Sequence, residues 1–177
     1  MKRINIPTPM QLLKIINPEN VSENNIVNWE YRKAARAVIF DNENRIGLLN
    51  VKNKNYYKLP GGGVEENEDI EIALDRECEE ELGVRIKVIK EVGSIIEYRS
   101  QFKLCQTSYC FLAKTSSEKN APNFTEEEKS EGFEAVWVEP EEALKLLNLK
   151  QTSDYEGKFI EERDFCFLNK ALTIATL

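Results

Sequence analysis

The stretch "LPGGGVEENEDIEIALDRECEEELGV", residues 59–84, sets three consecutive glycines ahead of a run rich in glutamate. Its second half predicts a helix over residues 69–82, because apolar side chains recur there at three- and four-residue spacing. These side chains belong to Ile70, Ala73, Leu74, Cys78 and Leu82. Gly83 follows at the position where glycine commonly ends a helix. The stretch therefore predicts a glycine-rich loop that leads into an amphipathic helix.

Three of the glutamates share one side of this helix. At about 100° per residue, Glu77, Glu80 and Glu81 project within an arc of roughly 100°, while the apolar side chains face elsewhere. Like charges at this spacing repel one another, at a cost of about a few tenths of a kcal/mol per pair. A solvated acidic face is the simplest interpretation. A site for a hard divalent cation is the alternative, because Mg²⁺ and Mn²⁺ prefer oxygen ligands.

The residues around the glutamates favour the cation site. Gly62, five residues, Glu68, seven residues and then "RECEEELGV", residues 76–84, follow the pattern G-x5-E-x7-R-E-U-x-E-E-x-G-U at every position, where U is apolar. This pattern resembles the signature of the Nudix hydrolase family. The resemblance spans roughly residues 33–150, because "ARAVIF" before the stretch and "WVEPEEAL" after it are also similar to the family's core. It implies an α/β fold of the α+β type, a Nudix-like α/β/α sandwich in which helices flank a mixed β-sheet.

The resemblance also implies roles for individual residues. It implies that Glu77, Glu80 and Glu81 bind the metal and are catalytic. The backbone carbonyl of Gly61 is expected to add a further ligand, and the implied metal is Mg²⁺, with Mn²⁺ as a substitute. Structural support of the site falls to Gly62, Glu68, Arg76 and Gly83. A salt bridge is expected between the arginine and the glutamate of that group, whereas Glu79 occupies the variable position of the pattern and is expected to face solvent.

The implied reaction is Mg²⁺-dependent hydrolysis of a pyrophosphate bond in a nucleoside diphosphate linked to another moiety. The substrate is expected to be a small nucleotide, such as a nucleoside triphosphate, ADP-ribose or a nucleotide sugar. Metal ions neutralise phosphate charge and lower the pKa of bound water. Because the chain contains no histidine, carboxylates remain as proton acceptors, and we favour Glu81. A further base or ligand is expected from the facing loop, at Glu126, Glu127, Glu128, Glu131 or Glu134.

Cationic and aromatic residues outside the stretch are candidates for substrate contacts. Arg36, Lys58 and Arg99 lie on predicted strands or loops from which they can reach phosphate or ribose groups. An aromatic ring can stack on a base, and the candidates are Tyr57, Tyr98 and Phe102. Each of these residues also has an ordinary interpretation as a surface or packing residue. No further motif identifies the substrate.

Two other functions remain open. The main alternative is a catalytically silent module of the same fold that binds a nucleotide as a sensor. We expect such a module to have altered glutamates in the signature, and none is altered here. An acidic interaction or calcium-buffering protein would bind Ca²⁺ without hydrolysis.

The composition argues against several classes of partner. With 41% hydrophobic and 31% charged residues among 177, the chain is expected to form one soluble domain. A net charge of −7 argues against nucleic-acid binding, which relies on clustered lysine and arginine. No apolar run reaches the length of a signal peptide or membrane span, so we expect a cytoplasmic protein without a membrane partner. The four cysteines form no C-x-x-C pair and are expected to be free thiols in the core.

The chain divides into an N-terminal extension, residues 1–32, and a Nudix hydrolase domain, residues 33–177, that includes a C-terminal helix. In the extension we expect a short helix near residues 11–16. The extension is also a candidate dimer interface, so the chain is expected to be a monomer or a homodimer. Strands are expected at residues 33–40, 45–51, 56–59, 84–99, 102–115 and 133–138. Helices are expected at residues 139–149 and 157–176.

Overall fold

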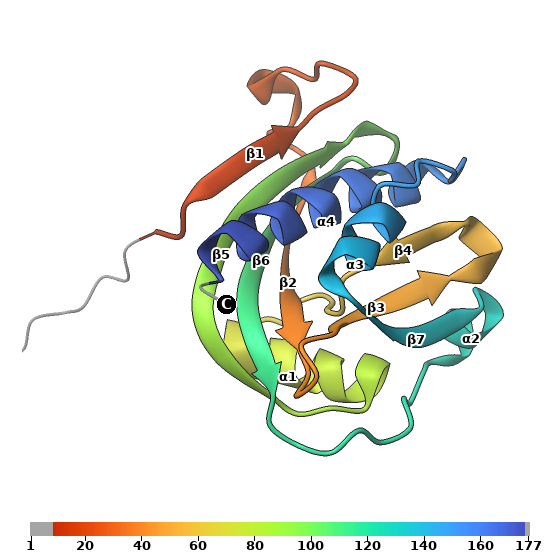
Figure 1. Ribbon diagram of the computed structural model, residues 1–177. Helices are drawn as coiled ribbons and strands as arrows, with labels where there is room; N and C mark the ends of the chain where they lie inside the picture. The colour runs from red at the N-terminus through yellow and green to blue at the C-terminus, as the bar shows by residue number, and fades with distance from the viewer. Residues whose placement is uncertain (1–8, 176–177) are drawn as a thin grey trace, which may run out of the picture.

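A mixed sheet of seven strands organises residues 9–175, the part of the chain that the computed structural model describes (Figure 1). The strands are β1 (Leu12–Ile16), β2 (Glu30–Phe40), β3 (Ile46–Val51), β4 (Tyr56–Lys58), β5 (Ile86–Arg99), β6 (Leu104–Thr115) and β7 (Phe133–Val138). Their order is β1-β5-β6-β2-β3-β4, and β7 pairs with β3. The pairs β1 with β5 and β2 with β6 are parallel, whereas the other pairs are antiparallel. The predicted mixed sheet is thus confirmed.

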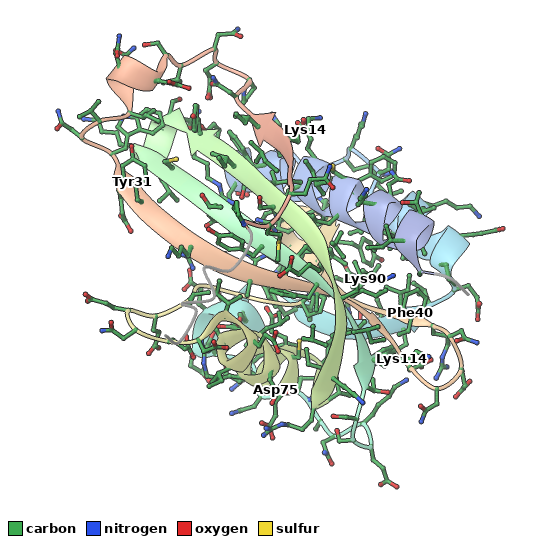
Figure 2. All side chains as sticks on the ribbon, turned by 90° about the vertical axis from the view of Figure 1, so that its left-hand side faces the viewer. Lys14, Tyr31, Phe40, Asp75, Lys90 and Lys114 are labelled. Atoms are coloured by element: carbon green, nitrogen blue, oxygen red, sulfur yellow. The ribbon has the colours of Figure 1, made fainter. Side chains whose placement is uncertain are left out.

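Helices cover both faces of the sheet. They are α1 (Ile70–Leu82), α2 (Glu126–Ser130), α3 (Pro140–Leu146) and α4 (Tyr155–Ile174), and Figure 2 shows α1 and α4 on opposite sides. Because successive strand residues point to opposite faces, β2 contributes to two cores. Val38 and Phe40 pack with α3 and α4, whereas Ala37 and Ile39 pack with α1. This arrangement confirms the predicted α/β/α sandwich. Within residues 9–175, no helix combines the length and apolar character needed to cross a membrane.

Helix α1 begins and ends where its sequence predicts. The side chain of Asp69 accepts hydrogen bonds from the N–H groups of Glu71 and Ile72, which satisfies part of the first turn. Gly83 ends the helix with φ +67°, a left-handed conformation that glycine adopts without steric cost. The buried side of the helix carries Ala73, Leu74, Cys78 and Leu82. Local sequence therefore specifies the helix that bears the clustered glutamates.

The loop after β6 holds the last turn of α1. The N–H of Asn123 donates to the carbonyl of Glu80 at 2.7 Å, and the N–H of Asn120 donates to the carbonyl of Gly83 at 2.9 Å. These carbonyls lie at the end of the helix, where the helix itself supplies no donors. The loop thus fixes the end of α1 that carries Glu80 and Glu81.

The helix predicted near residues 11–16 is wrong, because this segment is β1. It pairs in parallel with β5 at the edge of the sheet, and Ser94 N–H donates to the carbonyl of Gln11 at 2.8 Å. A helix of six residues has little stability by itself, whereas an open sheet edge offers backbone partners. The division of the chain at residue 32 stays a prediction.

The other expected elements are present, with ends that shift by a few residues. Helix α2 lies between the strands expected at residues 102–115 and 133–138, where no helix is predicted. The four cysteines are free, as expected. Cys78 and Cys110 are fully buried in the two cores, whereas Cys166 is half-buried.

A buried carboxylate joins the turn between β2 and β3 to the loop after β6. Asp41 accepts hydrogen bonds from Lys119 at 2.6 Å, from the Arg45 side chain at 2.9 Å, and from the N–H groups of Glu43 and Arg45. The Lys119 ammonium also lies 3.9 Å from the centroid of the Trp137 ring. Burial alone would raise the pKa of Asp41, but these hydrogen bonds outweigh it and lower the pKa to about 2.

The substitution Asp41→Asn tests this contact through its pH dependence. A carboxyl whose pKa falls from an unfolded value of about 3.9 stabilises the fold fully above about pH 5, and loses that effect as the pH falls toward its folded pKa. We expect the free energies of unfolding of the natural chain and the variant to differ by on the order of 2 kcal/mol at neutral pH. The difference should shrink toward zero near the folded pKa, as measured by urea denaturation. The exposed Glu43, changed to Gln, is the control and should show no such trend; a difference for Asp41→Asn that does not vary with pH would contradict the prediction.

Candidate active site

The carboxylate of Glu81 connects α1 to the turn that follows β4. Its side chain is 2% exposed, and Lys58 Nζ donates to Oε1 at 2.7 Å. The backbone N–H of Gly61 donates to Oε2, also at 2.7 Å. Burial raises the pKa of Glu81, while the Lys58 charge and the Gly61 N–H act in the opposite direction. Both oxygens are therefore bonded inside the protein.

The carboxylate of Glu77 lies against the same turn. Arg76 Nη1 donates to Glu77 Oε1 at 2.8 Å, and a Cβ placed on Gly62 would stand only 2.4 Å from the Glu77 carboxyl carbon. Arg76 also donates to Glu68 at 3.1 and 3.2 Å, which is the salt bridge expected from the sequence. Arg76 thus joins the loop before α1 to the glutamates on α1.

Glu80 is the most accessible of the three glutamates. Its side chain is 46% exposed, and one oxygen lies 3.6 Å from Arg76 Nη1. Burial raises the pKa of Glu80, and the negative charge of Glu77 raises it further. The crowding inferred from the sequence therefore acts between these two carboxylates. Glu79 lies outside the crowded group and pairs with Arg85 at the surface.

The glycine turn packs its backbone against β2. The carbonyls of Pro60 and Gly62 accept hydrogen bonds from Ala37 N–H at 3.1 Å and Ala35 N–H at 2.9 Å. Among the residues that the structure describes, none donates a hydrogen bond to the carbonyl of Gly61, which lies between them. Gly61 has φ +131°, and a Cβ there would stand 2.0 Å from the Ala35 carbonyl oxygen. The turn therefore requires glycine and leaves one carbonyl oxygen available.

The donors gathered here fit a hard divalent cation. Glu77 and Glu81 flank the turn that carries Gly61 O, and Glu80 lies beside Glu77 on the same helix. All of these donors are oxygens, the kind that Mg²⁺ and Mn²⁺ prefer. Across residues 9–175, no three acidic or cysteine side chains converge as a ready-made metal site. In this arrangement Glu77 is turned onto Arg76 and Glu81 onto Lys58, so two of the chain's own cations offset the carboxylate charge.

The acidic residues predicted to face α1 differ in their surroundings. Glu131 pairs with Lys54 at 2.6 Å and Glu134 with Lys52 at 2.9 Å. Glu126 is exposed and pairs with Lys129, and Glu127 is also exposed. The charge of Glu128 raises the pKa of Glu80, and its carboxylate also caps α2 by accepting from the N–H of Thr125. None of the predicted set is bonded to Glu77, Glu80 or Glu81 among the residues that the structure describes, so an added base or ligand from this loop stays a prediction.

One of the three candidate cations, Lys58, bonds directly to a glutamate of α1. Lys58 bonds to Glu81 and also lies 5.0 Å from the centroid of the Phe133 ring. Arg36 is buried in β2 and donates to the Ala35 carbonyl, and burial and the charge of Arg163 lower its pKa to about 10. Arg99 is buried and pairs with Glu97 of β5 and Glu156 of α4. A role of these cations in substrate binding stays a prediction.

The candidate stacking residues lie in three different surroundings. Tyr57 is half-buried against the core beneath α3 and α4, and Tyr98 is buried beside Ile26 and Cys105. Phe102 is 52% exposed, and its ring makes an edge-to-face contact with the ring of Tyr155. Of the three, Phe102 presents the most accessible ring.

A buried polar network beneath α4 was not anticipated from the sequence. Arg163 Nη1 donates to Glu97 at 3.3 Å and Arg163 Nε donates to Asp164 at 2.7 Å. The other oxygen of Asp164 accepts from the N–H of Leu59 at 2.8 Å. Burial alone would raise the pKa of Glu97, but the charges of Arg163 and Arg99 outweigh it and lower the pKa to about 2. The charged run "EERD", residues 161–164, interrupts an otherwise amphipathic helix and is the signal that could have revealed this network.

Alanine at two neighbouring glycines should give unequal effects on stability. In Gly61→Ala the new Cβ meets a fixed backbone oxygen at a positive φ, and we expect a loss on the order of 3 kcal/mol. In Gly62→Ala the Cβ meets the flexible end of the Glu77 side chain, which can rotate away, so a loss of about 1 kcal/mol or less is expected. The free energy of unfolding in urea measures both. Similar losses in the two variants would show that the turn is not packed as described.

Comparison with known proteins places this geometry in a family. The sequence model described as "NUDIX domain" matches residues 30–162, which include β2 to β7 and the glutamates of α1. An RNA pyrophosphohydrolase from Pelagibacter ubique (strain HTCC1062) is 34% identical over 77 residues. That match covers 42% of this chain and 49% of the relative, so the chain matches about half the length of this curated protein.

Solved structures share the fold at low sequence identity. The MutT protein from Methanosarcina mazei Go1 is 17% identical with a TM-score of 0.53, and the similarity covers 77% of this chain and 94% of that one. An ADP-ribose pyrophosphatase from Streptococcus suis 89-1591 is 17% identical with a TM-score of 0.52, covering 82% of this chain and 94% of that one. At this identity the likeness concerns the fold alone. With the match of the family model over most of its length, the chain belongs to the NUDIX domain family.

Proposed function

We propose that this chain is a divalent-metal-dependent pyrophosphohydrolase that cleaves a nucleoside diphosphate linked to another moiety. The observation that carries the proposal is that Glu77 and Glu81 of α1 lie against the Gly61–Gly62 turn, where the carbonyl oxygen of Gly61 is available, while Glu80 lies beside Glu77 on the same helix. A silent sensor would be expected to have altered glutamates in the signature, and none is altered here. Members of the family generally use divalent metals, and we propose Mg²⁺, with Mn²⁺ as a substitute.

Each residue of the group has a proposed part in the reaction. The three glutamates and the carbonyl of Gly61 would hold the cation, which would offset phosphate charge and acidify water when bound. Arg76 orients Glu77, and Lys58 with Gly61 N–H orients Glu81. Glu81, favoured from the sequence as the base, would have to exchange one of these bonds to accept a proton, whereas Glu80 reaches solvent without rearrangement. Glu80 is therefore the first of the three to test.

The proposed substrate is a small nucleotide derivative. The names of the RNA pyrophosphohydrolase and the ADP-ribose pyrophosphatase both describe pyrophosphate cleavage, which supports this class of reaction for a chain of the same family. The net charge of −7 favours a free nucleotide over a nucleic-acid backbone.

A cytoplasmic location is proposed as well, since free thiols persist in a reducing compartment. Gel filtration would distinguish the monomer from the homodimer.

A hydrolysis panel with Mg²⁺ or Mn²⁺ tests the proposal. It should contain nucleoside triphosphates, oxidised nucleotides, ADP-ribose, nucleotide sugars, dinucleoside polyphosphates and an oligoribonucleotide with a 5′-triphosphate. We expect release of phosphate products from at least one small nucleotide only when the metal is present. A ligand that raises the melting temperature without being cleaved would instead indicate the silent sensor.

The variant Glu80→Gln should lose activity while the fold persists. Its side chain is half-exposed and its nearest ion-pair partner, Arg76 Nη1, is 3.6 Å away, so we expect stability near that of the natural chain and a fall in kcat/KM of at least about 100-fold. Glu79→Gln, at the variable position three residues before Leu82, is the matched control and should retain activity. Near-normal turnover in Glu80→Gln, on a substrate that the natural chain cleaves, would contradict the assignment.

A further inference from the structure

The turn that carries Gly61 is held from both sides of the sheet. From α1, the carboxylate of Glu81 binds Lys58 Nζ and Gly61 N–H. From α4, the carboxylate of Asp164 binds the N–H of Leu59 at 2.8 Å. The two helices lie on opposite faces (Figure 2). The segment 58–61 is therefore the place where both helical layers meet the candidate metal site.

Asp164 is held rigidly where it makes this contact. It is fully buried, and its second oxygen accepts from Arg163 Nε at 2.7 Å. Arg163 is itself fully buried and donates to Glu97, which also accepts from Arg99 at 2.9 Å and Gln106 at 2.9 Å. A buried carboxylate is stable only when such partners compensate its charge. The network thus fixes the oxygen that receives the Leu59 N–H.

The contact with Asp164 constrains the residues that follow. Leu59 is fully buried in the core beneath α4, the carbonyl of Pro60 accepts from Ala37, and Gly61 N–H donates to Glu81. Removing Asp164 would leave the Leu59 N–H buried without an acceptor, and this penalty favours movement of the backbone toward another partner. Such movement starts two residues from Gly61 O. No polar group of α4 other than Asp164 is bonded to segment 58–61 within residues 9–175.

We propose that Asp164 is a positioning residue for the metal site. It holds the Leu59–Gly61 turn from the far face of the sheet, and this contact keeps the carbonyl of Gly61 and the carboxylate of Glu81 in fixed positions relative to each other. This inference rests on the proposed function, because it assigns Asp164 a purpose at the same cation site. Residues that orient metal ligands without touching the metal commonly change metal affinity by about 10- to 100-fold when they are replaced.

The test measures Mn²⁺ binding to the full chain by the electron paramagnetic resonance signal of free Mn²⁺. Asp164→Ala should raise the dissociation constant for Mn²⁺ by about 10-fold or more. Asp164→Asn keeps the size of the side chain but offers one acceptor oxygen to two donors, so its affinity for Mn²⁺ should lie between that of the natural chain and that of Asp164→Ala. This variant provides the test if the alanine variant does not fold. Raising the metal concentration should restore kcat in the variants, and KM for the nucleotide at saturating metal should stay unchanged.

Leu168→Ala is the matched control. Leu168 is fully buried one turn further along α4 and packs in the apolar core, so its loss destabilises the same helix without removing a bond to the turn. Even if Leu168→Ala loses as much unfolding free energy as Asp164→Ala, it should bind Mn²⁺ with the affinity of the natural chain. Equal weakening of Mn²⁺ binding in Leu168→Ala and Asp164→Ala would reduce the role of Asp164 to general packing and overturn the inference.

Two further outcomes separate this inference from the proposed function. A natural chain that binds Mn²⁺ and hydrolyses a nucleotide, together with Asp164 variants of unchanged metal affinity, would overturn the inference alone. A natural chain that binds no Mn²⁺ and cleaves no member of the panel would overturn both.

Discussion

The buried bonds of Glu81 are the constraint on which the rest of the site depends. A carboxylate that is 2% exposed is costly unless a cation and hydrogen-bond donors compensate it. Lys58, the last residue of β4, and the N–H of Gly61, in the turn that follows β4, meet this need. The requirement to compensate one charge therefore fixes the distance between the helix and the glycine turn. Loss of either partner would leave the carboxylate buried without adequate compensation.

The same principle explains how the protein tolerates crowded glutamates. Arg76 lies between Glu68 and Glu77, and Lys58 lies beside Glu81, so the repulsion on α1 is reduced by neighbouring cations. Glu80 has the weakest compensation, since its nearest cationic atom is 3.6 Å away. A divalent cation would complete this balance at Glu80, the most exposed of Glu77, Glu80 and Glu81. The crowding that is unfavourable for an isolated helix is thus suited to a metal-binding protein.

The sequence predicts features that short-range interactions determine. Helix α1 is of this kind, because Asp69 caps its start, apolar residues recur along one side and Gly83 ends it. The placement of Glu77, Glu80 and Glu81 on one side of this helix also follows from their spacing, whereas their proposed role rests on the resemblance to the family signature. The parallel pairing of β2 with β6 and the strand character of residues 12–16 were not predictable, because they depend on partners far along the chain. The hydrogen bonds of the site were not predictable for the same reason. Lys58 and Glu81 are 23 residues apart in the sequence, and Leu59 and Asp164 are 105 residues apart.

The contact between Leu59 and Asp164 has a consequence for biosynthesis. A growing polypeptide that has emerged from the ribosome through β7 already contains every glutamate of α1, the glycine turn and Lys58. It still lacks α4, which supplies the acceptor for the Leu59 N–H. It also lacks the apolar side chains of α4 that pack over one face of the sheet. Because domains complete their folding only when their contacting elements are available, the turn reaches its final geometry after α4 has been translated. Translation of α4 therefore sets the earliest time at which the turn can reach this geometry.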